Sequence, residues 1–554
     1  MRIGGIASGM DTEQMVQSLM KAERLRIDRF FQQEQRLKWR QEAYNNINRS
    51  MANFILDSRK AFGLTTVSNT GTMLNRSAES FNWVKKATSN DESIVKATAN
   101  ANAMAGTHKI EVKQLADVAS ATSKNLKEEN FDGKMLVDGE GKFNFNKREL
   151  ILSTGAAEGR SIKVEIGSDT NIKTMDDFVK FLNTATSKEE GKEDVSLGMR
   201  AAYDKSLGRL MLTTKETGDN QYIKIKDTTG DNLNFAEVAF DAEQIDGEGN
   251  LKIKGEDAKI LFNGQEVKKS TNNFSIFGIN LQLQAEQAEN AEPITIRVEA
   301  DTDSIFDKVK SFVDEYNKII DMINGQLGEK YYRDFAPLTD EQKEAMSEKD
   351  IELWEEKAKS GLLRNDSTLT RTLQTMRSNL YERVENVTGS YNNITQLGIT
   401  TGAYQDGGKL VIDEQKLRNA INDDPEGVVN LLFKTPDASI TNDKEKMKNT
   451  GLVQRIYDGM TDGIKEVIRQ SGPGEDAALL RNVRSNILID FVTAGSQSVL
   501  DKDLSNINSR IAREEMLLAK REDRYWQQFT AMEKALSQMN QQSAWLMSQL
   551  GQQY

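Results

Sequence analysis

The sequence predicts an α+β multidomain fold: long terminal helices pairing as a coiled coil, a helical trunk domain, and inserted, mainly antiparallel β head domains. Neither Gly nor Pro occurs from Met10 to Phe62 or from Ser496 to Leu550, so both ends of the 554-residue chain can form long helices. From Phe81 to about Ala300, helical spacing gives way to short runs that alternate apolar and polar residues. The order helix, β insertion, helix brings the two ends together.

The N-terminal helix is predicted to begin at Asp11, whose carboxylate can accept from free backbone N–H groups, with Gln14 three residues on. Gly63 is a suitable residue to end it. Apolar residues recur along it at helical spacing and draw a stripe down one face. The members of this stripe that we expect to contact a partner are Val16, Leu19, Met20, Ile27 and Phe30.

The C-terminal helix carries a near-heptad apolar seam that starts at Leu500 and runs to the end of the helix. Three polar residues, Glu514, Arg521 and Ser543, interrupt it. Its expected partner-binding residues are Phe529, Met532, Leu536, Met539, Leu546 and Leu550.

Each terminal helix would be about 80 Å long at 1.5 Å per residue, too long to be covered by a small globular core. Each stripe therefore needs another helix. The two ends can pair within one subunit, between subunits, or with the helices of a partner. A self-contained two-helix stalk and a stalk that also docks elsewhere both fit this pattern.

Between the ends, nine β-type runs are separated by Gly, Asn and Asp turns, which predicts a mostly antiparallel region. One helix interrupts it, opened by a capping box of Thr174 and Asp177 and burying Phe178, Phe181 and Leu182. The nine runs are 93–99, 108–115, 142–153, 161–167, 208–214, 221–227, 258–264, 279–285 and 294–300.

After Asp301 the helical spacing returns, with a strong amphipathic stripe from Ile305 to Leu327. A β hairpin turning at Asp406 and Gly407 is expected within the trunk, and helices are expected from Leu452 to Ile468 and from Ala477 to Val492. We therefore divide the chain into four domains. They are a terminal helical domain (1–45 and 515–554), a helical trunk or leg with one β hairpin (46–80 and 301–514), a β head (81–115 and 256–300) and a second β-rich head (116–255).

Composition excludes several classes of protein. Asp and Glu number 85 against 73 Lys and Arg, a net charge of −12, and no basic cluster suited to nucleic acid is present. No apolar run approaches the roughly 18 residues of a membrane span, and MRIGGIASGMDTEQM lacks the apolar core of a cleaved signal peptide. We expect no nucleic-acid partner and no membrane insertion.

An enzyme is the less favoured class. Cysteine is absent and His108 is the one histidine, so thiol chemistry and most triads and zinc sites are excluded. We place His108 on the exposed face of a strand. No Gly-Lys pair is followed by Ser or Thr, so there is no phosphate-binding loop of the Walker type. No catalytic residue, cofactor or metal site is expected.

Several segments resemble the flagellar hook-associated protein 2 family of filament-capping proteins. They include the opening GGIASGMDTEQMVQSLMKAE, the trunk segment from Ala336 to Asp366, APLTDEQKEAMSEKDIELWEEKAKSGLLRND, and the closing helix from Arg510 to Leu550. Motifs at opposite ends, in the same order, make the resemblance specific. It covers both ends and the trunk, while the β insertion from about Ala116 to Gly255 resembles nothing further.

The resemblance implies an extracellular cap at the tip of the bacterial flagellum, a homo-oligomer usually of five subunits. Such a cap promotes ordered incorporation and folding of exported flagellin and prevents its loss to the medium. Expected partners are flagellin, the hook-filament junction protein, the flagellar type III export apparatus and an export chaperone. Export by that route, without a cleaved signal peptide, suits a chain free of Cys. The alternative is an adhesin or structural rod that binds a surface through its β heads.

Overall fold

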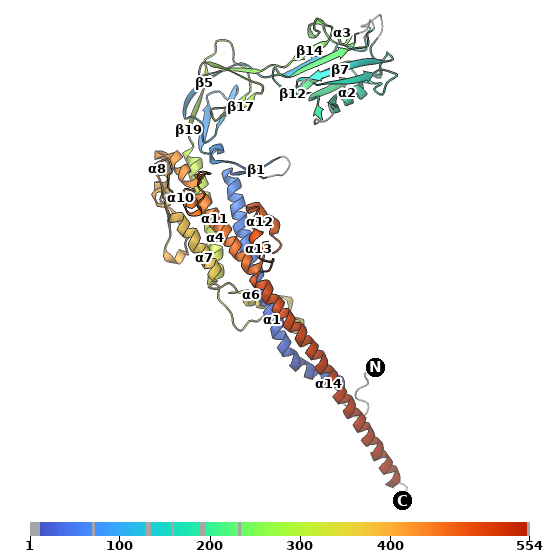
Figure 1. Ribbon diagram of the computed structural model, residues 1–554, viewed down its shortest axis with the longest axis vertical. Coiled ribbons are helices and arrows are strands. Elements are labelled where there is room, and N and C mark those ends of the chain that lie inside the picture. Colours follow the sequence, from blue (N-terminus) through green and yellow to red (C-terminus); the bar gives the residue numbers. More distant parts are fainter. Residues whose placement is uncertain are drawn as a thin grey trace. The chain divides into compact units, whose positions relative to one another are not determined.

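The computed structural model describes residues 11–68, 73–128, 135–157, 160–187, 194–230 and 234–550. The chain forms two compact units. Unit 1 combines Met1–Ala78 with Thr302–Tyr554, and unit 2 is Glu79–Asp301. Long terminal helices and several antiparallel sheets confirm the predicted α+β class. Figure 1 shows the elements of each unit.

Helix α1 (Thr12–Phe62) begins and ends where its capping residues predict. The Asp11 carboxylate accepts from the backbone N–H of Gln14 at 2.9 Å, and Gly63 closes the helix in the left-handed region with φ 80°. Helix α14 (Val499–Leu550) starts with a reciprocal pair of 3.1 Å bonds between Ser498 and Asp501. Both predicted terminal helices are confirmed.

Besides α14, helices α4, α11 and α12 of unit 1 pack against α1. Helices α4 and α11 and the hairpin β20–β21 follow the expected pattern, whereas the predicted helix from Ala477 to Val492 is split. Ser485 and Asn486 lie at the break, where side chains that hydrogen-bond locally compete with helix. The bounds are β1 (Thr65–Val67), β2 (Met73–Asn75), α4 (Thr302–Gly328), α5 (Asp340–Glu344), α6 (Glu348–Lys359), α7 (Ser367–Tyr381), β20 (Ile399–Thr401), β21 (Leu410–Ile412), α8 (Glu414–Asp423), α9 (Pro425–Phe433), α10 (Asp443–Lys448), α11 (Leu452–Ser471), α12 (Ala477–Val483) and α13 (Ile489–Thr493).

An aromatic cluster joins four helices in the core of unit 1. The ring of Phe54 lies 5.4 Å from that of Phe312 and 6.4 Å from that of Tyr457. Phe62 lies 5.4 Å from Phe312 and 4.7 Å from Phe433. The second half of α1 is thereby held against α4, α9 and α11, because each buried ring adds apolar burial and edge contacts.

Buried polar side chains also position helices of unit 1. Asp366 accepts from Thr368 N and Leu369 N at the start of α7 and from the hydroxyl of Tyr44 on α1. Arg455 of α11, which is 1% exposed, donates only to backbone carbonyls, at the C-terminal ends of α7 and α10. A cation at these ends satisfies free carbonyls and opposes the negative ends of the helix dipoles.

Unit 2 contains two apolar β cores. The first β core lies between two antiparallel sheets, of strand order β16-β15-β5-β19-β3 and β17-β18-β4. Ile110, Ile260, Leu281 and Ile296 are among its buried members. The bounds are β3 (Lys85–Ser89), β4 (Val95–Ala99), β5 (Gly106–Gln114), β15 (Ala258–Phe262), β16 (Gln265–Lys269), β17 (Asn273–Ile276), β18 (Ile279–Leu283) and β19 (Ile294–Ala300).

The second β core lies between sheets of order β14-β13-β7-β8 and β11-β12-β6, with α2 (Met175–Thr184) and α3 (Phe235–Ala239). The capping box of Thr174 and Asp177 is confirmed, and Phe178 and Leu182 are buried while Phe181 is half-buried. The bounds are β6 (Val118–Thr122), β7 (Arg148–Thr154), β8 (Ser161–Ile166), β9 (Thr186–Ser187), β10 (Val195–Ser196), β11 (Met199–Asp204), β12 (Arg209–Thr217), β13 (Tyr222–Asp227) and β14 (Leu251–Lys254).

The expectation that His108 is exposed is wrong. His108 is 6% exposed, because it shares a strand face with Ile110 and Val112, two and four residues on. Its Nδ1 faces the amide nitrogen of Asn263 at 3.3 Å and its Nε2 lies 3.0 Å from the carbonyl oxygen of Met104. The imidazole is a hydrogen-bonded core side chain.

A buried ion pair joins β7 and β13, two neighbouring strands of one sheet of the second β core. Arg148 donates to Asp227 Oδ2 at 2.8 Å, and both side chains are 3% exposed. Burial raises the pKa of Asp227, but bonds from Thr229, from the backbone N–H of Phe235 and from Arg148 outweigh it and hold the pKa below its ordinary value. The carboxylate therefore stabilises the folded state only while it is ionised.

We predict that Asp227→Asn lowers the free energy of unfolding by about 3 kcal/mol at pH 7, because it removes the negative charge that faces the buried Arg148 guanidinium. Since the folded pKa lies below the unfolded one, this stabilisation is full above the unfolded pKa, about 4, and is lost as pH falls through the folded pKa. Calorimetric melts of the full chain from pH 7 to pH 3 should show a shallower acid dependence in the variant.

The matched control is Glu165→Gln, which removes one member of the half-exposed pair Lys147–Glu165. It should change stability by less than about 0.5 kcal/mol. Equal losses for the two variants would contradict the role given to the buried pair.

Candidate partner-binding site

The first part of α1, to about Gln41, and the part of α14 from Val499 to about Met532 lie side by side in unit 1 and run in opposite directions (Figure 1). Three side-chain contacts fix how the helices align. Gln41 Nε2 donates to Asp501 Oδ1 at 2.9 Å, Arg26 pairs with Glu514 at 3.1 Å, and Glu23 pairs with Arg521. The two termini therefore pair within one chain, which was one of three open possibilities.

Two of the three residues that interrupt the apolar seam of α14 are explained by this alignment. Glu514 and Arg521 face charges of opposite sign on α1, and Tyr525 adds a hydroxyl 3.3 Å from Glu23 Oε1. Glu23 itself stands in the stripe of α1, three residues after Met20 and four before Ile27. Opposite charges inside a seam favour one register of pairing over its neighbours.

The predicted residues of α1 are partly enclosed. Val16, Met20 and Ile27 are 2%, 8% and 4% exposed, and Phe30 is half-buried. Leu19 is 40% exposed and lies on a different face from the buried residues. Four of the five α1 residues are therefore already packed within the chain, and Leu19 is the accessible one among them.

The predicted residues of α14 divide along the helix. Phe529, Met532 and Leu536 are half-buried, whereas Met539 is 63% and Leu546 53% exposed. Trp545 and Met547, at 62% and 73%, are exposed beside them. The side chain of Leu550 lies outside the described residues. The role of all these side chains in partner binding stays a prediction.

The offset between the helices explains this division. At an equal rise of 1.5 Å per residue, the contacts place Thr12, where α1 begins, opposite the segment from about Thr530 to Met532. The rest of α14 continues past the start of α1 for roughly 18 residues, or about 27 Å. We call residues 533–550 the α14 tip.

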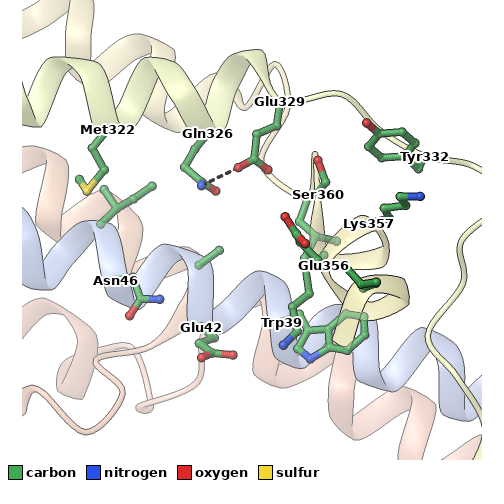
Figure 2. A pocket seen from close by; sticks show the side chains of 15 residues that line it. Trp39, Glu42, Asn46, Met322, Gln326, Glu329, Tyr332, Glu356, Lys357 and Ser360 are labelled. Carbon is green, nitrogen blue, oxygen red and sulfur yellow. Dashed lines mark hydrogen bonds between the residues drawn. The ribbon is translucent and has the colours of Figure 1, made fainter. Parts of the chain in front are cut away.

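A surface pocket of about 640 Å³ lies between α1, α4 and α6 (Figure 2). One of its three carboxylates, Glu329, accepts from Gln326 Nε2 at 2.9 Å and from Gly361 N at 2.8 Å, and Lys359 lies over the Trp39 ring. These side chains already make hydrogen bonds or ring contacts within the trunk. Ala43, Ile47 and Leu362 give the pocket apolar walls, and it contains no His or Cys.

Across the described ranges of the chain, no three His, Cys, Asp or Glu side chains are grouped to hold a metal ion. None of the helices in the described part of the chain is long and apolar enough to cross a membrane.

Comparison with known proteins identifies the family. The family profile for the N-terminus of flagellar hook-associated protein 2 matches residues 8–119, and that for its C-terminus matches residues 255–541. The chain is 31% identical to flagellar hook-associated protein 2 of Halalkalibacterium halodurans over 98% of both chains. It belongs to the flagellar hook-associated protein 2 family. This is a family of structural flagellar cap proteins and not of enzymes, and it places the chain at the tip of the flagellum.

Two further comparisons agree. The B-type flagellar hook-associated protein 2 of Pseudomonas aeruginosa is 29% identical, over 69% of this chain and 73% of its own. The crystal structure of domains D1-D2-D3 of the flagellar cap protein FliD from Escherichia coli superposes with a TM-score of 0.51 at 21% identity, and covers 80% of this chain and 99% of that one. The last result shows a common fold.

Sequence reasoning missed Glu23 and Arg26, which set the alignment of α1 with α14. The signal was present: an acidic residue interrupts the stripe of α1 and a basic one, Arg521, interrupts the seam of α14. When an acidic residue interrupts the apolar stripe of one long helix and a basic residue interrupts that of another, the two charges predict that the helices pair and in which register.

We predict that Glu23→Arg and Arg521→Glu each weaken the α1–α14 pair by about 0.5 to 1 kcal/mol, and that the double variant restores most of the loss. Chymotrypsin cleavage within the paired segments measures this, with roughly two- to fivefold faster cleavage expected for each single variant. The same charge swap at Lys21–Glu341, both two-thirds exposed, is the control and should leave the rate unchanged. Failure of the double variant to recover would contradict the alignment.

Proposed function

We propose that the chain caps the flagellar filament, oligomerises at the growing tip, and promotes the ordered incorporation and folding of exported flagellin, so that flagellin is not lost to the medium. The observation that carries the proposal is the α14 tip. Family membership supports the cap itself, and the tip supplies a physical means of contact with the filament.

From Ala535 onward, the α14 tip combines exposed apolar side chains with an absence of charge. Met539, Trp545, Leu546 and Met547 are each more than half exposed, and no Asp, Glu, Lys or Arg occurs from Ala535 onward. An uncharged amphipathic helix end buries its apolar face in a groove or against helices of a partner. Met repacks at low cost, which suits a partner surface that changes with each inserted subunit.

The proposed partners follow from this role. They are flagellin, the hook-filament junction protein, further copies of this chain in a ring of about five, the flagellar type III export apparatus and an export chaperone. Export through the flagellar channel requires an unfolded chain, and a chain without Cys forms no disulfide that would resist unfolding. Family membership favours this function over the alternative of a surface-binding rod.

Deletion of the gene tests the proposal. Loss of the cap should leave abundant unpolymerised flagellin in the medium and few filaments, and restoring the gene should reverse both. The measurement is the amount of flagellin in the medium against that in filaments. Normal filaments without leakage in the deletion strain would contradict capping.

We predict that the double variant Met539→Glu, Leu546→Glu fails to restore filaments, because two charges would then enter the face that packs against the partner. Flagellin in the medium should rise at least tenfold over the restored strain. Gln541→Glu with Ser548→Glu adds the same charges at the same spacing on the opposite side of the helix and should restore filaments. Restoration of filaments by the variant Met539→Glu, Leu546→Glu would remove this face of the tip from the binding surface.

A further inference from the structure

The sulfur chemistry of this chain rests on methionine alone. The sequence contains 20 Met and no Cys, so no thiol competes with the thioethers for an oxidant. The one histidine, His108, is only 6% exposed. A hydroperoxide that reaches the folded chain therefore meets first the methionine sulfurs that are open to solvent.

Burial divides the methionines into two groups. On the α14 tip, Met539 is 63% and Met547 73% exposed. Elsewhere in the chain, Met104 and Met516 are exposed to a similar degree, 64% and 61%. Buried methionines include Met20, Met51, Met175, Met199, Met376 and Met460. Oxidation of the folded chain should therefore be selective, and the tip should be among the first places to react.

The local sequence of the tip leaves its two exposed sulfurs with little cover. Long side chains in a helix lean toward the preceding turn and lie over the residues three and four positions back. Under Met547 those residues are Ser543 and Ala544, and Ala535 is one of the two under Met539. All three are small, and no long charged side chain occurs from Ala535 onward. The helix itself therefore shields neither thioether.

We propose that Met539 and Met547 form an oxidation site for hydroperoxides, and that their oxidation blocks contact of the α14 tip with the filament. Each thioether sulfur takes one oxygen atom from the peroxide as the O–O bond breaks. The sulfur is oxidised by two electrons to the sulfoxide, and hydrogen peroxide is reduced to water. The proposal rests on the proposed function, because it concerns the regulation of the same tip.

The chemistry of the sulfoxide explains the loss of contact. Oxidation converts a flexible apolar side chain into a polar one with a new hydrogen-bond acceptor. Burying that acceptor without a donor costs free energy, and the cheap repacking of the thioether is lost. Both side chains are accessible only before the tip docks, so the modification acts on chains that have not yet docked. Reversal requires a methionine sulfoxide reductase.

Peptide mapping by mass spectrometry after treatment of the full-length chain with hydrogen peroxide tests the site. Met539 and Met547 should each gain one oxygen atom at the lowest peroxide concentrations that react. Buried Met51 and Met460 should gain none while the melting temperature of the chain is unchanged. Oxidation of the tip methionines no faster than of Met51 would overturn the site.

The consequence is tested with the full-length chain, labelled on lysine, and with filaments reassembled from purified flagellin. No Lys occurs from Ala535 onward, so the label leaves that segment unmodified. Peroxide is removed before mixing, so that flagellin is not oxidised. Oxidation should lower the fraction of filament ends that carry the chain by about fivefold or more, and methionine sulfoxide reductase should restore it.

Matched variants assign the effect to the tip. Met539→Leu with Met547→Leu keeps the apolar side chains and should bind filament ends equally before and after peroxide. Met104→Leu with Met516→Leu removes two methionines of similar exposure elsewhere and should stay sensitive. A second measurement needs no variant: after partial oxidation, chains that fail to bind should be enriched in sulfoxide at Met539 and Met547.

The outcomes separate this inference from the proposed function. Binding that survives oxidation of Met539 and Met547, or equal sulfoxide in bound and unbound chains, overturns the inference and leaves the cap intact. Protection by Met104→Leu with Met516→Leu also overturns it. An untreated wild-type chain that never binds filament ends overturns the filament contact of the proposed function and this inference with it.

Discussion

The antiparallel pairing of α1 with α14 is the constraint on which the account of the terminal helices depends. The two helices have almost equal lengths, 51 and 52 residues, but their ends do not coincide. The contacts of Gln41, Arg26 and Glu23 offset the two helices by about 18 residues. The C-terminal end of each helix therefore extends past the end of the other helix. The free end of α1 is buried in the trunk by the aromatic cluster of Phe54 and Phe62, whereas the free end of α14 is exposed.

This offset separates the stability of unit 1 from its binding function. The trunk depends on buried rings, on Arg455 across the ends of two helices and on Asp366 beside Tyr44, all within α1, α4, α7, α9, α10 and α11. The α14 tip contributes little apolar burial to the folded chain, since Met539 and Leu546 remain mostly in water. Substitutions on the tip can therefore alter partner binding while the trunk stays folded.

Much of the fold could be predicted from local rules. The absence of Gly and Pro, together with Asp11 and Gly63, defines α1, and alternating runs such as Ile162, Val164 and Ile166 define the long strands. Strands β3 and β16 were missed because their sequences, KKATS and QEVKK, carry the charges typical of sheet edges. The side chain of His108 was wrongly predicted to be exposed. Residues two apart in a strand share a face, so His108 lies on the buried face with Ile110 and Val112, and this spacing was overlooked. The candidate site was only half predictable: the apolar stripes are periodic, but which residues become exposed depends on a register set across almost 500 residues of chain.

Hydrogen exchange of the free, full-length chain tests the central claim most directly, because it reads the protection of α1 and α14 segment by segment. The account predicts slow exchange along α1 and along α14 from Val499 to about Met532, and fast exchange from Met539 onward, where α14 extends past the start of α1 and its apolar side chains are exposed. Uniform protection to the end of α14, or exchange at unfolded rates throughout both helices, would contradict the paired, offset arrangement.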